Sequence, residues 1–180
     1  MRWTGCLLLA ASTLGAQTAK LRAPDVPYEP SSPAIVAEMV KLGGVTRRDV
    51  VYDLGCGDGR VVIAAVKKGA RGIGIDIDPQ RITEARENAR QAGVTGRVTF
   101  RNEDLFLSDF RNATVVMLYL WPEVNLKLRP RLLAELKPGT RVVSHSHSMG
   151  DWKPDKQVEV EGHTIYLWTI PNKQAAGAAK

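Results

Sequence analysis

The sequence predicts an α/β fold in which a mainly parallel sheet carries helices on both faces. Between about residues 31 and 171, short β-forming runs alternate with runs that place apolar residues at helical spacing. Such alternation is typical of βαβ units and a parallel sheet. The last two β-forming runs, 157–161 and 164–170, flank a turn at Gly162, which predicts an antiparallel hairpin at the sheet edge.

The best-defined βα unit surrounds residues 53–59, with the sequence DLGCGDG. A β-forming run precedes this stretch, and residues 60–68 follow with helical spacing. Three glycines remove Cβ atoms where the backbone must turn sharply and a ligand can approach: Gly55, Gly57 and Gly59. The helix start behind the turn favours an anionic group, so a ligand with a carboxylate or phosphate is expected. An ordinary tight βα turn is the alternative interpretation.

The glycine spacing differs from that of the dinucleotide-binding fingerprint G-x-G-x-x-G. The third glycine of that fingerprint would fall at Arg60. A nicotinamide-dependent dehydrogenase is therefore disfavoured.

Length and composition favour one globular domain with a substantial core. The chain has 180 residues, 44% of them hydrophobic, which is too short for two α/β domains. The net charge of +6 would suit an acidic partner, but the basic residues are dispersed and do not interleave with aromatic residues. We therefore expect a solvated basic surface and no nucleic acid partner.

The cysteines and histidines give little support for a disulfide or a metal site. Cys6 and Cys56 form no CxxC pair, which argues against a disulfide framework or a zinc site. His145 and His147 would share one face of a strand, but no third ligand lies near them in the sequence. We expect no metal, and expect Cys56 to pack as a small residue in the turn.

Residues 1–16 resemble a signal peptide. Arg2 gives a positive start, residues 6–14 an apolar core, and Ala16 a small residue at a plausible cleavage point. The run is too short to span a bilayer comfortably. A membrane-tethering segment or a misassigned start codon are the alternatives.

Four prolines, at positions 24, 27, 30 and 33, predict an extended lead-in over residues 17–30. Ser31 or Ser32 is expected to cap a helix that has Pro33 in its first turn and that ends at two glycines, residues 43–44. The small, polar tail, residues 172–180, is expected to be disordered.

Acidic residues follow three successive predicted strands. Asp53 opens the glycine turn, Asp76 ends the strand 72–76, and Asp104 follows the strand 97–101. Because parallel strands end at one edge of a sheet, Asp76 can reach a ligand at the turn and accept two hydrogen bonds from a ribose diol. Acids after a strand are also ordinary loop residues.

Asp78 and the second half of the chain complete the predicted elements. Asp78 precedes a proline at a helix start, so we interpret it as a cap. The apolar run 113–120 predicts a central strand buried on both faces. A helix over about 123–136 and a strand over 141–145 follow.

The pattern D-x-G-x-G-x-G resembles motif I of class I S-adenosylmethionine (SAM) dependent methyltransferases. Further blocks are similar to one subfamily: VPYEPS at 26–31, GID at 74–76, YLWPEVN at 119–125, LKPG at 136–139 and WKP at 152–154. That subfamily contains the seven-strand protein-lysine methyltransferases that modify the mitochondrial adenine-nucleotide carrier and the c-type subunit of ATP synthase, with prokaryotic relatives. The resemblance implies a Rossmann-like, doubly wound seven-stranded domain over residues 31–171.

The resemblance also implies SAM as cofactor and assigns the parts of its site. The amino-acid end would meet Asp53 and the glycine turn, the ribose Asp76, and the adenine Asp104. The expected acceptor is an accessible lysine of a protein. Candidates for the acceptor channel, or else core or rim aromatics, are Tyr28, Tyr119, Trp121 and Trp152, of which Tyr119 and Trp121 are the predicted catalytic residues.

Other functions and the compartment stay open at this point. A small-molecule or RNA methyltransferase would use the same cofactor site, and a non-catalytic SAM-binding module would also fit. Where the subfamily pattern has an acid after the fifth strand, this chain has Ser146, His147 and Ser148, and no general base stands out. The signal-like start indicates export or membrane proximity, whereas dependence on SAM indicates the cytoplasm.

Overall fold

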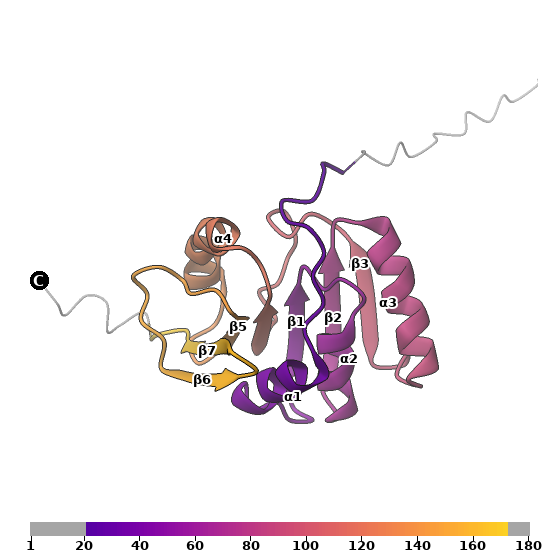
Figure 1. Cartoon of the computed structure of the whole chain (residues 1–180), viewed down its shortest axis with the longest axis horizontal. Helices are drawn as coiled ribbons and strands as arrows, with labels where there is room; N and C mark the ends of the chain where they lie inside the picture. The colour runs from indigo at the N-terminus through magenta and orange to yellow at the C-terminus, as the bar shows by residue number, and fades with distance from the viewer. Residues whose placement is uncertain (1–20, 173–180) are drawn as a thin grey trace, which may run out of the picture.

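The computed structural model describes residues 21–172, which form one seven-stranded sheet with helices on both faces (Figure 1). In chain order the elements are α1 (Pro33–Leu42), β1 (Val50–Leu54), α2 (Arg60–Lys67), β2 (Arg71–Asp76), α3 (Pro79–Gln91), β3 (Val98–Asn102), β4 (Val115–Leu118), α4 (Pro122–Glu135), β5 (Arg141–His145), β6 (Lys156–Val160) and β7 (His163–Thr169).

The strand order is β3-β2-β1-β4-β5-β7-β6. The strands β1 to β5 are parallel, and β7 is antiparallel to both of its neighbours, β5 and β6. The predicted α/β class, the seven-stranded, mainly parallel sheet and the C-terminal antiparallel hairpin are all confirmed. The strand order reverses between β1 and β4, and an open α/β sheet binds its ligand at such a switch point.

Alternate side chains of the strands enter two different cores. Val51 of β1 packs with apolar side chains of α1 and α2, whereas Tyr52 and Leu54 pack with side chains of α4 on the other face. The contact with α2 is close: a Cβ added at Gly72 of β2 would lie 2.6 Å from a methyl carbon of Val62. The glycine therefore lets the helix approach the sheet.

For most helices and strands, the boundaries predicted from local sequence signals agree with the observed ones to within one or two residues. The Ser32 side chain accepts a hydrogen bond from the Ile35 amide and caps α1, and Asp78 caps α3 through the Gln80 amide. The strand predicted over 113–120 is shorter, because Tyr119 and Leu120 leave the sheet and line a pocket at its edge.

The expectation that one strand carries both His145 and His147 is wrong. The strand β5 ends at His145, and Ser146 has a left-handed backbone with φ 60°. Both imidazoles nevertheless lie near the Tyr119 ring, with centroid distances of 3.9 and 6.2 Å. The turn at Ser146, and not the alternation of a strand, brings them to one place.

The signal-like segment 1–16, the first four residues of the lead-in and residues 173–180 lie outside the described residues. Between residues 21 and 172, no helix has the length and apolarity needed to cross a membrane. Residues 21–30 form no helix or strand, consistent with the extended conformation predicted from their prolines.

Candidate active site

A pocket lies at the carboxyl edge of the sheet, beside the switch point of the strand order. Most of its wall residues come from four regions: the segment 22–31, the glycine turn, the loop ends after β2 and β3, and residues 118–120 at the end of β4. The segment 22–31, called the strap below, crosses this edge before the chain enters α1 (Figure 1). The prolines indicated an extended lead-in, and only the resemblance, through Tyr28, indicated that this segment lies beside the site.

The glycine turn adopts the conformation for which glycine is needed. The φ angles of Gly55, Gly57 and Gly59 are 83°, 52° and 80°, a region that residues with a Cβ rarely occupy. The Gly57 amide donates to the Asp76 carboxylate at 2.8 Å, and the Arg60 amide donates to Asp58 at 3.2 Å. Two of the amides expected to receive an anionic ligand are therefore already bonded to the chain's own carboxylates.

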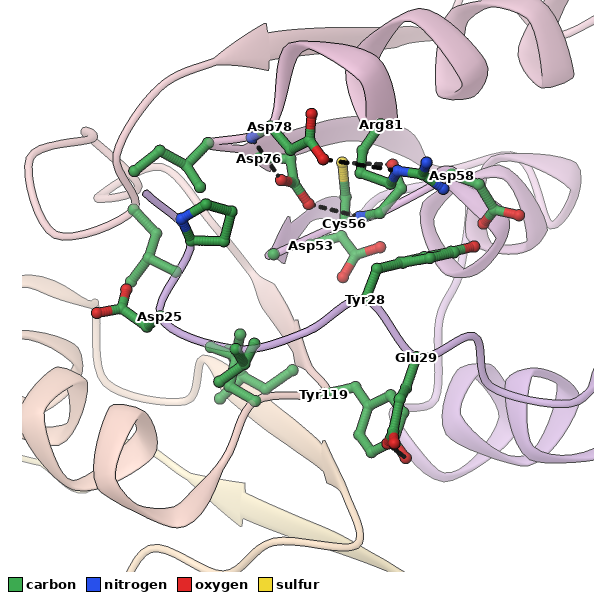
Figure 2. Close-up of a pocket in the computed structure, with 18 of the residues that line it drawn as sticks. Asp25, Tyr28, Glu29, Asp53, Cys56, Asp58, Asp76, Asp78, Arg81 and Tyr119 are labelled. Carbon is green, nitrogen blue, oxygen red and sulfur yellow. Dashed lines mark hydrogen bonds and ion pairs between the residues drawn. The ribbon is translucent and has the colours of Figure 1, made fainter. Parts of the chain in front are cut away.

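Asp53 is a buried carboxyl group with one unsatisfied oxygen. Its residue is 4% exposed, and Oδ2 has no hydrogen-bond partner. Burial, together with the nearby Asp76 carboxylate, raises the pKa of Asp53 to about 8, although a backbone hydrogen bond from Val62 opposes that shift. Its carboxylate lies in the space between Asp76 and Tyr28 (Figure 2). An unsatisfied acidic oxygen facing a cavity suits a cationic group that donates hydrogen bonds.

Asp76 and Asp78, at the end of β2, bind different backbone amides. The Asp76 carboxylate accepts from the Gly57 amide and, at 2.9 Å, from the Asp78 amide, so it fixes the glycine turn against the next loop. Burial raises the pKa of Asp76. The Asp78 carboxylate accepts from the Gln80 amide at 2.8 Å, as predicted for a helix cap.

Asp104 lies on the pocket wall, in contact with an arginine of the strap. Arg22 donates from Nε to Oδ2 of Asp104 at 2.6 Å and from a terminal nitrogen to Oδ1 at 3.1 Å, and the Phe106 amide also donates to Oδ1. The hydrogen bonds from Arg22 hold the pKa of Asp104 below its usual value. An adenine amine that reaches Asp104 meets a carboxylate already bridged by Arg22, a contact that the sequence did not predict.

Tyr28 fastens the middle of the strap to the glycine turn. A Cβ added at Gly57 would lie 2.5 Å from a ring carbon of Tyr28, so the ring rests directly on the turn. The Arg81 guanidinium lies 4.5 Å from the ring centroid on the side of α3. The strap is also held at its end, where Ser31 Oγ is hydrogen-bonded to His145 Nδ1 at 2.9 Å.

The two predicted catalytic aromatics occupy different places. Tyr119 lines the pocket, and its hydroxyl donates to the Glu29 carboxylate of the strap at 3.1 Å. Trp121, which is 46% exposed, lines a neighbouring groove between Val26, Phe106 and Val124.

His145, beneath the Tyr119 ring, is buried, and its Nε2 has no partner. Burial lowers the pKa of His145 to about 4, so the ring is neutral at pH 7. Of the other two aromatic candidates, Tyr28 is on the pocket wall, but Trp152 is not. Trp152 packs beside Trp168, with ring centroids 5.7 Å apart. It is therefore a rim or core aromatic, the alternative to a channel residue.

The described residues contain no group of three or more histidine, cysteine or acidic side chains arranged to hold a metal ion. Cys56 is a free, buried thiol in the glycine turn, and a Cβ at Gly74 would lie 2.8 Å from its sulfur. It packs as the sequence predicted.

The fold and this site define a class I SAM-dependent methyltransferase. The strand order, the glycine turn at the switch point and the unsatisfied Asp53 oxygen fit a cofactor that carries an ammonium group and approaches the backbone closely.

More specifically, the chain belongs to the family described as the ANTKMT methyltransferase domain, whose model matches residues 53–156. A relative named protein-lysine N-methyltransferase, from Saccharolobus islandicus, is 43% identical over 153 residues, covering 82% of this chain and 95% of that protein. The adenine nucleotide translocase lysine N-methyltransferase of Mus musculus is 35% identical over 131 residues, and the match covers 72% of this chain but 57% of the mouse protein.

A solved structure from Salinibacter ruber gives a third comparison. It is described as an RNA methyltransferase in complex with S-adenosyl-L-homocysteine, and it is 53% identical with a TM-score of 0.79. The match covers 81% of this chain and 95% of that one. The family and this neighbour agree on SAM as the cofactor, while their names differ in the acceptor.

Proposed function

We propose that this enzyme transfers a methyl group from SAM to a lysine side chain of a protein. Relatives named for lysine methylation support the acceptor class, one of them over nearly its whole length. The observation that carries the proposal is the charge of the pocket walls, because the acceptor must pass between them.

The walls are acidic although the whole chain has a net charge of +6. Seven acidic residues line the pocket: Asp25, Glu29, Asp53, Asp58, Asp76, Asp78 and Asp104. The basic residues that line it are Arg22, Arg60 and Arg81. A cleft with an excess of one charge raises the local concentration of the opposite charge, so this pocket favours a cationic cofactor and a cationic acceptor. A polyanion would gain nothing there.

For methyl transfer, the protein must position the acceptor nitrogen against the methyl group and exclude water from the site. The cofactor supplies an electrophilic methyl group on a sulfonium, and the acceptor nitrogen must approach it in line. The Tyr119 ring and the strap line the pocket, and a bound cofactor and acceptor would displace water from between them. At pH 7 a lysine with a pKa of about 10.4 needs about 4 to 5 kcal/mol to present its neutral amine, so this desolvation also favours the form that reacts.

We assign the cofactor contacts from the same walls. The unsatisfied Asp53 oxygen would accept from the ammonium of the amino-acid end, and Gly55 and Gly57 line the pocket beside it. Gly59 contributes through the turn itself, because its missing Cβ faces the Phe100 ring and not the pocket. Asp76 would hold the ribose. Asp104 would receive the adenine amine while Arg22 keeps its carboxylate in place.

Asp76→Ala and Asp78→Ala are expected to separate ligand binding from helix capping. Asp76→Ala should weaken SAM binding by about 1 to 3 kcal/mol, since it loses charge-assisted hydrogen bonds and frees the Gly57 amide. Asp78→Ala should lower the free energy of unfolding by about 1 kcal/mol and change SAM affinity little. Calorimetric titration with SAM and urea denaturation measure the two effects. A loss of affinity confined to the Asp78 variant would transfer the ribose to that carboxylate.

Asp53→Asn is expected to change the pH dependence of stability. The pKa of Asp53 is about 8 in the folded chain and about 3.9 when unfolded, so between these values the folded state binds more protons and its stability falls as pH rises. Asparagine removes this titration. The free energy of unfolding should therefore fall less between pH 5 and 8 in the variant, while SAM affinity drops at least about tenfold, the scale of a charged hydrogen bond.

The control for Asp53→Asn is Asp109→Asn. Asp109 is an exposed acid paired with Arg111, which lowers its pKa, so its contribution lies outside this pH range. Urea midpoints at four pH values between 5 and 8 are sufficient. Parallel pH curves for wild type and Asp53→Asn would show that Asp53 is ionised in the free protein.

RNA is the second candidate acceptor, and the name of the 53% identical neighbour is the observation that favours it. One experiment addresses both acceptors. The enzyme is incubated with SAM carrying a labelled methyl group and a cell lysate, and the products are divided and treated with ribonuclease or protease. We expect protease-sensitive label, located on lysine by mass spectrometry. Label that only ribonuclease removes would replace the lysine proposal with the RNA one.

A further inference from the structure

One carboxylate at the acceptor end of the pocket, Glu29 of the strap, has surroundings unlike those of the other acidic residues on the walls. It is exposed and lines the pocket, and its hydrogen bond comes from the Tyr119 hydroxyl. The two side chains point toward one another, away from the Asp53 and Asp76 group (Figure 2). Glu29 therefore lies beside the residue expected to flank the reacting nitrogen.

The other wall carboxylates either form an ion pair with an arginine or lie at the cofactor end. Ion pairs join Asp25 and Asp104 to Arg22, Asp58 to Arg60, and Asp78 to Arg81. Asp53 is buried, and Asp76 accepts backbone amides of the glycine turn and the next loop. Within residues 21–172, Glu29 alone among these seven combines exposure with the lack of an ion-pair partner.

The two histidines beside the Tyr119 ring add no positive charge near Glu29 at pH 7. Burial lowers the pKa values of both His145 and His147, so their rings are neutral at pH 7. Glu123, in the first turn of α4, and Glu29 both act on His147 from nearby and add negative charge to this end of the pocket. This end of the pocket therefore carries two carboxylates, Glu29 and Glu123, whereas arginines pair with four of the six aspartates on the remaining walls.

We propose that Glu29 is a specificity-determining residue that receives the ammonium group of the acceptor lysine. Its carboxylate pairs with the ammonium beside the Tyr119 ring, and after the ammonium loses one proton to solvent the neutral amine still donates to Glu29. The amine nitrogen then forms the new bond to the methyl carbon as the sulfur–methyl bond breaks, and the sulfur keeps that electron pair. This inference rests on the proposed lysine acceptor.

The test compares Glu29→Gln with wild type in transfer of labelled methyl from SAM to poly-L-lysine. Glutamine keeps the size and the hydrogen bond from Tyr119 but removes the charge, so KM for poly-L-lysine should rise at least tenfold while kcat falls less and the SAM Kd stays within twofold. The increase of KM with added NaCl should also be weaker in the variant, since the salt-sensitive attraction has been removed. Glu29→Asp should recover part of the affinity.

The matched control is Glu87→Gln, which neutralises a partly exposed glutamate on α3 that is paired with Arg90. Its KM and salt dependence should equal those of wild type. Wild-type labelling of poly-L-lysine with the same KM in both glutamine variants would overturn the role of Glu29 alone. No labelling of poly-L-lysine by wild type would overturn the lysine acceptor and, with it, this inference.

Discussion

Replacing Gly57 with valine is expected to abolish SAM binding while most of the fold is kept. Gly57 has φ 52°, a conformation that costs a β-branched residue about 1 to 3 kcal/mol. Its added Cβ would also lie 2.5 Å from the Tyr28 ring, so the strap must move away from the turn. The side chain would then occupy the space between turn and strap that the cofactor needs. Affinity for SAM should fall at least about 100-fold, about 3 kcal/mol.

Gly96→Val is the matched control for Gly57→Val. A Cβ added at Gly96 meets no atom within 4 Å, so this valine should leave SAM affinity unchanged. Titration calorimetry with SAM gives both affinities, and far-ultraviolet circular dichroism checks the fold. SAM affinity within a few-fold of wild type in a folded Gly57→Val protein would remove the glycine turn from the cofactor site.

The sheet was predictable from the sequence because its signals are local. Runs of β-forming residues, proline at the first turn of three helices and capping by Ser32 and Asp78 all act within a few residues. The reversal in strand order follows from the resemblance, and the parallel strands then bring Asp53 and Asp76 to one edge. The glycine turn could be located for the same reason, since its backbone demands glycine whatever packs around it.

The contacts that hold the strap could not be predicted from local patterns, because they are long-range. Arg22 meets Asp104 across 82 residues and Ser31 meets His145 across 114, and no periodic pattern precedes such contacts. The prolines explain why the segment is extended, but they do not determine where on the sheet it packs. For that reason the sequence assigned Asp104 to adenine without its arginine, and missed Glu29 although it named Tyr119.

The charges of the site show how local and long-range information combine. Each acid is visible in the sequence, but whether it is neutralised depends on a partner that folding supplies. Burial, and after it the neighbouring Asp76 carboxylate, raises the pKa of Asp53, whereas hydrogen bonds from Arg22 lower the pKa of Asp104. Although both aspartates lie at strand ends, Asp53 thus keeps its proton at pH 7, whereas Asp104 is ionised and held in place by Arg22.

Removing the aromatic side chains of the acceptor channel is expected to impair methyl transfer far more than cofactor binding. Tyr119→Ala uncovers His145 and deletes the ring that desolvates the amine, so kcat for a lysine acceptor should fall about 10- to 100-fold, as positioning effects of this size require. Trp121→Ala opens the groove beside the pocket and should lower kcat/KM. SAM Kd should stay within about threefold in both, and Tyr119→Phe, which keeps the ring, should retain most of kcat.

The pH profile of the same reaction identifies the acceptor. Only the neutral amine of lysine carries the lone pair that attacks, so kcat/KM for a lysine acceptor should rise about tenfold per pH unit from pH 7 toward the lysine pKa of about 10.4. No histidine in the channel interrupts this rise, because the pKa of His145 is about 4 and that of His147 is lowered as well. A nucleobase ring nitrogen without a proton, such as N1 of adenine, already has its lone pair free at pH 7 and would give a flat profile. A flat profile, together with full activity of Tyr119→Ala and Trp121→Ala, would therefore exclude lysine and favour the RNA acceptor.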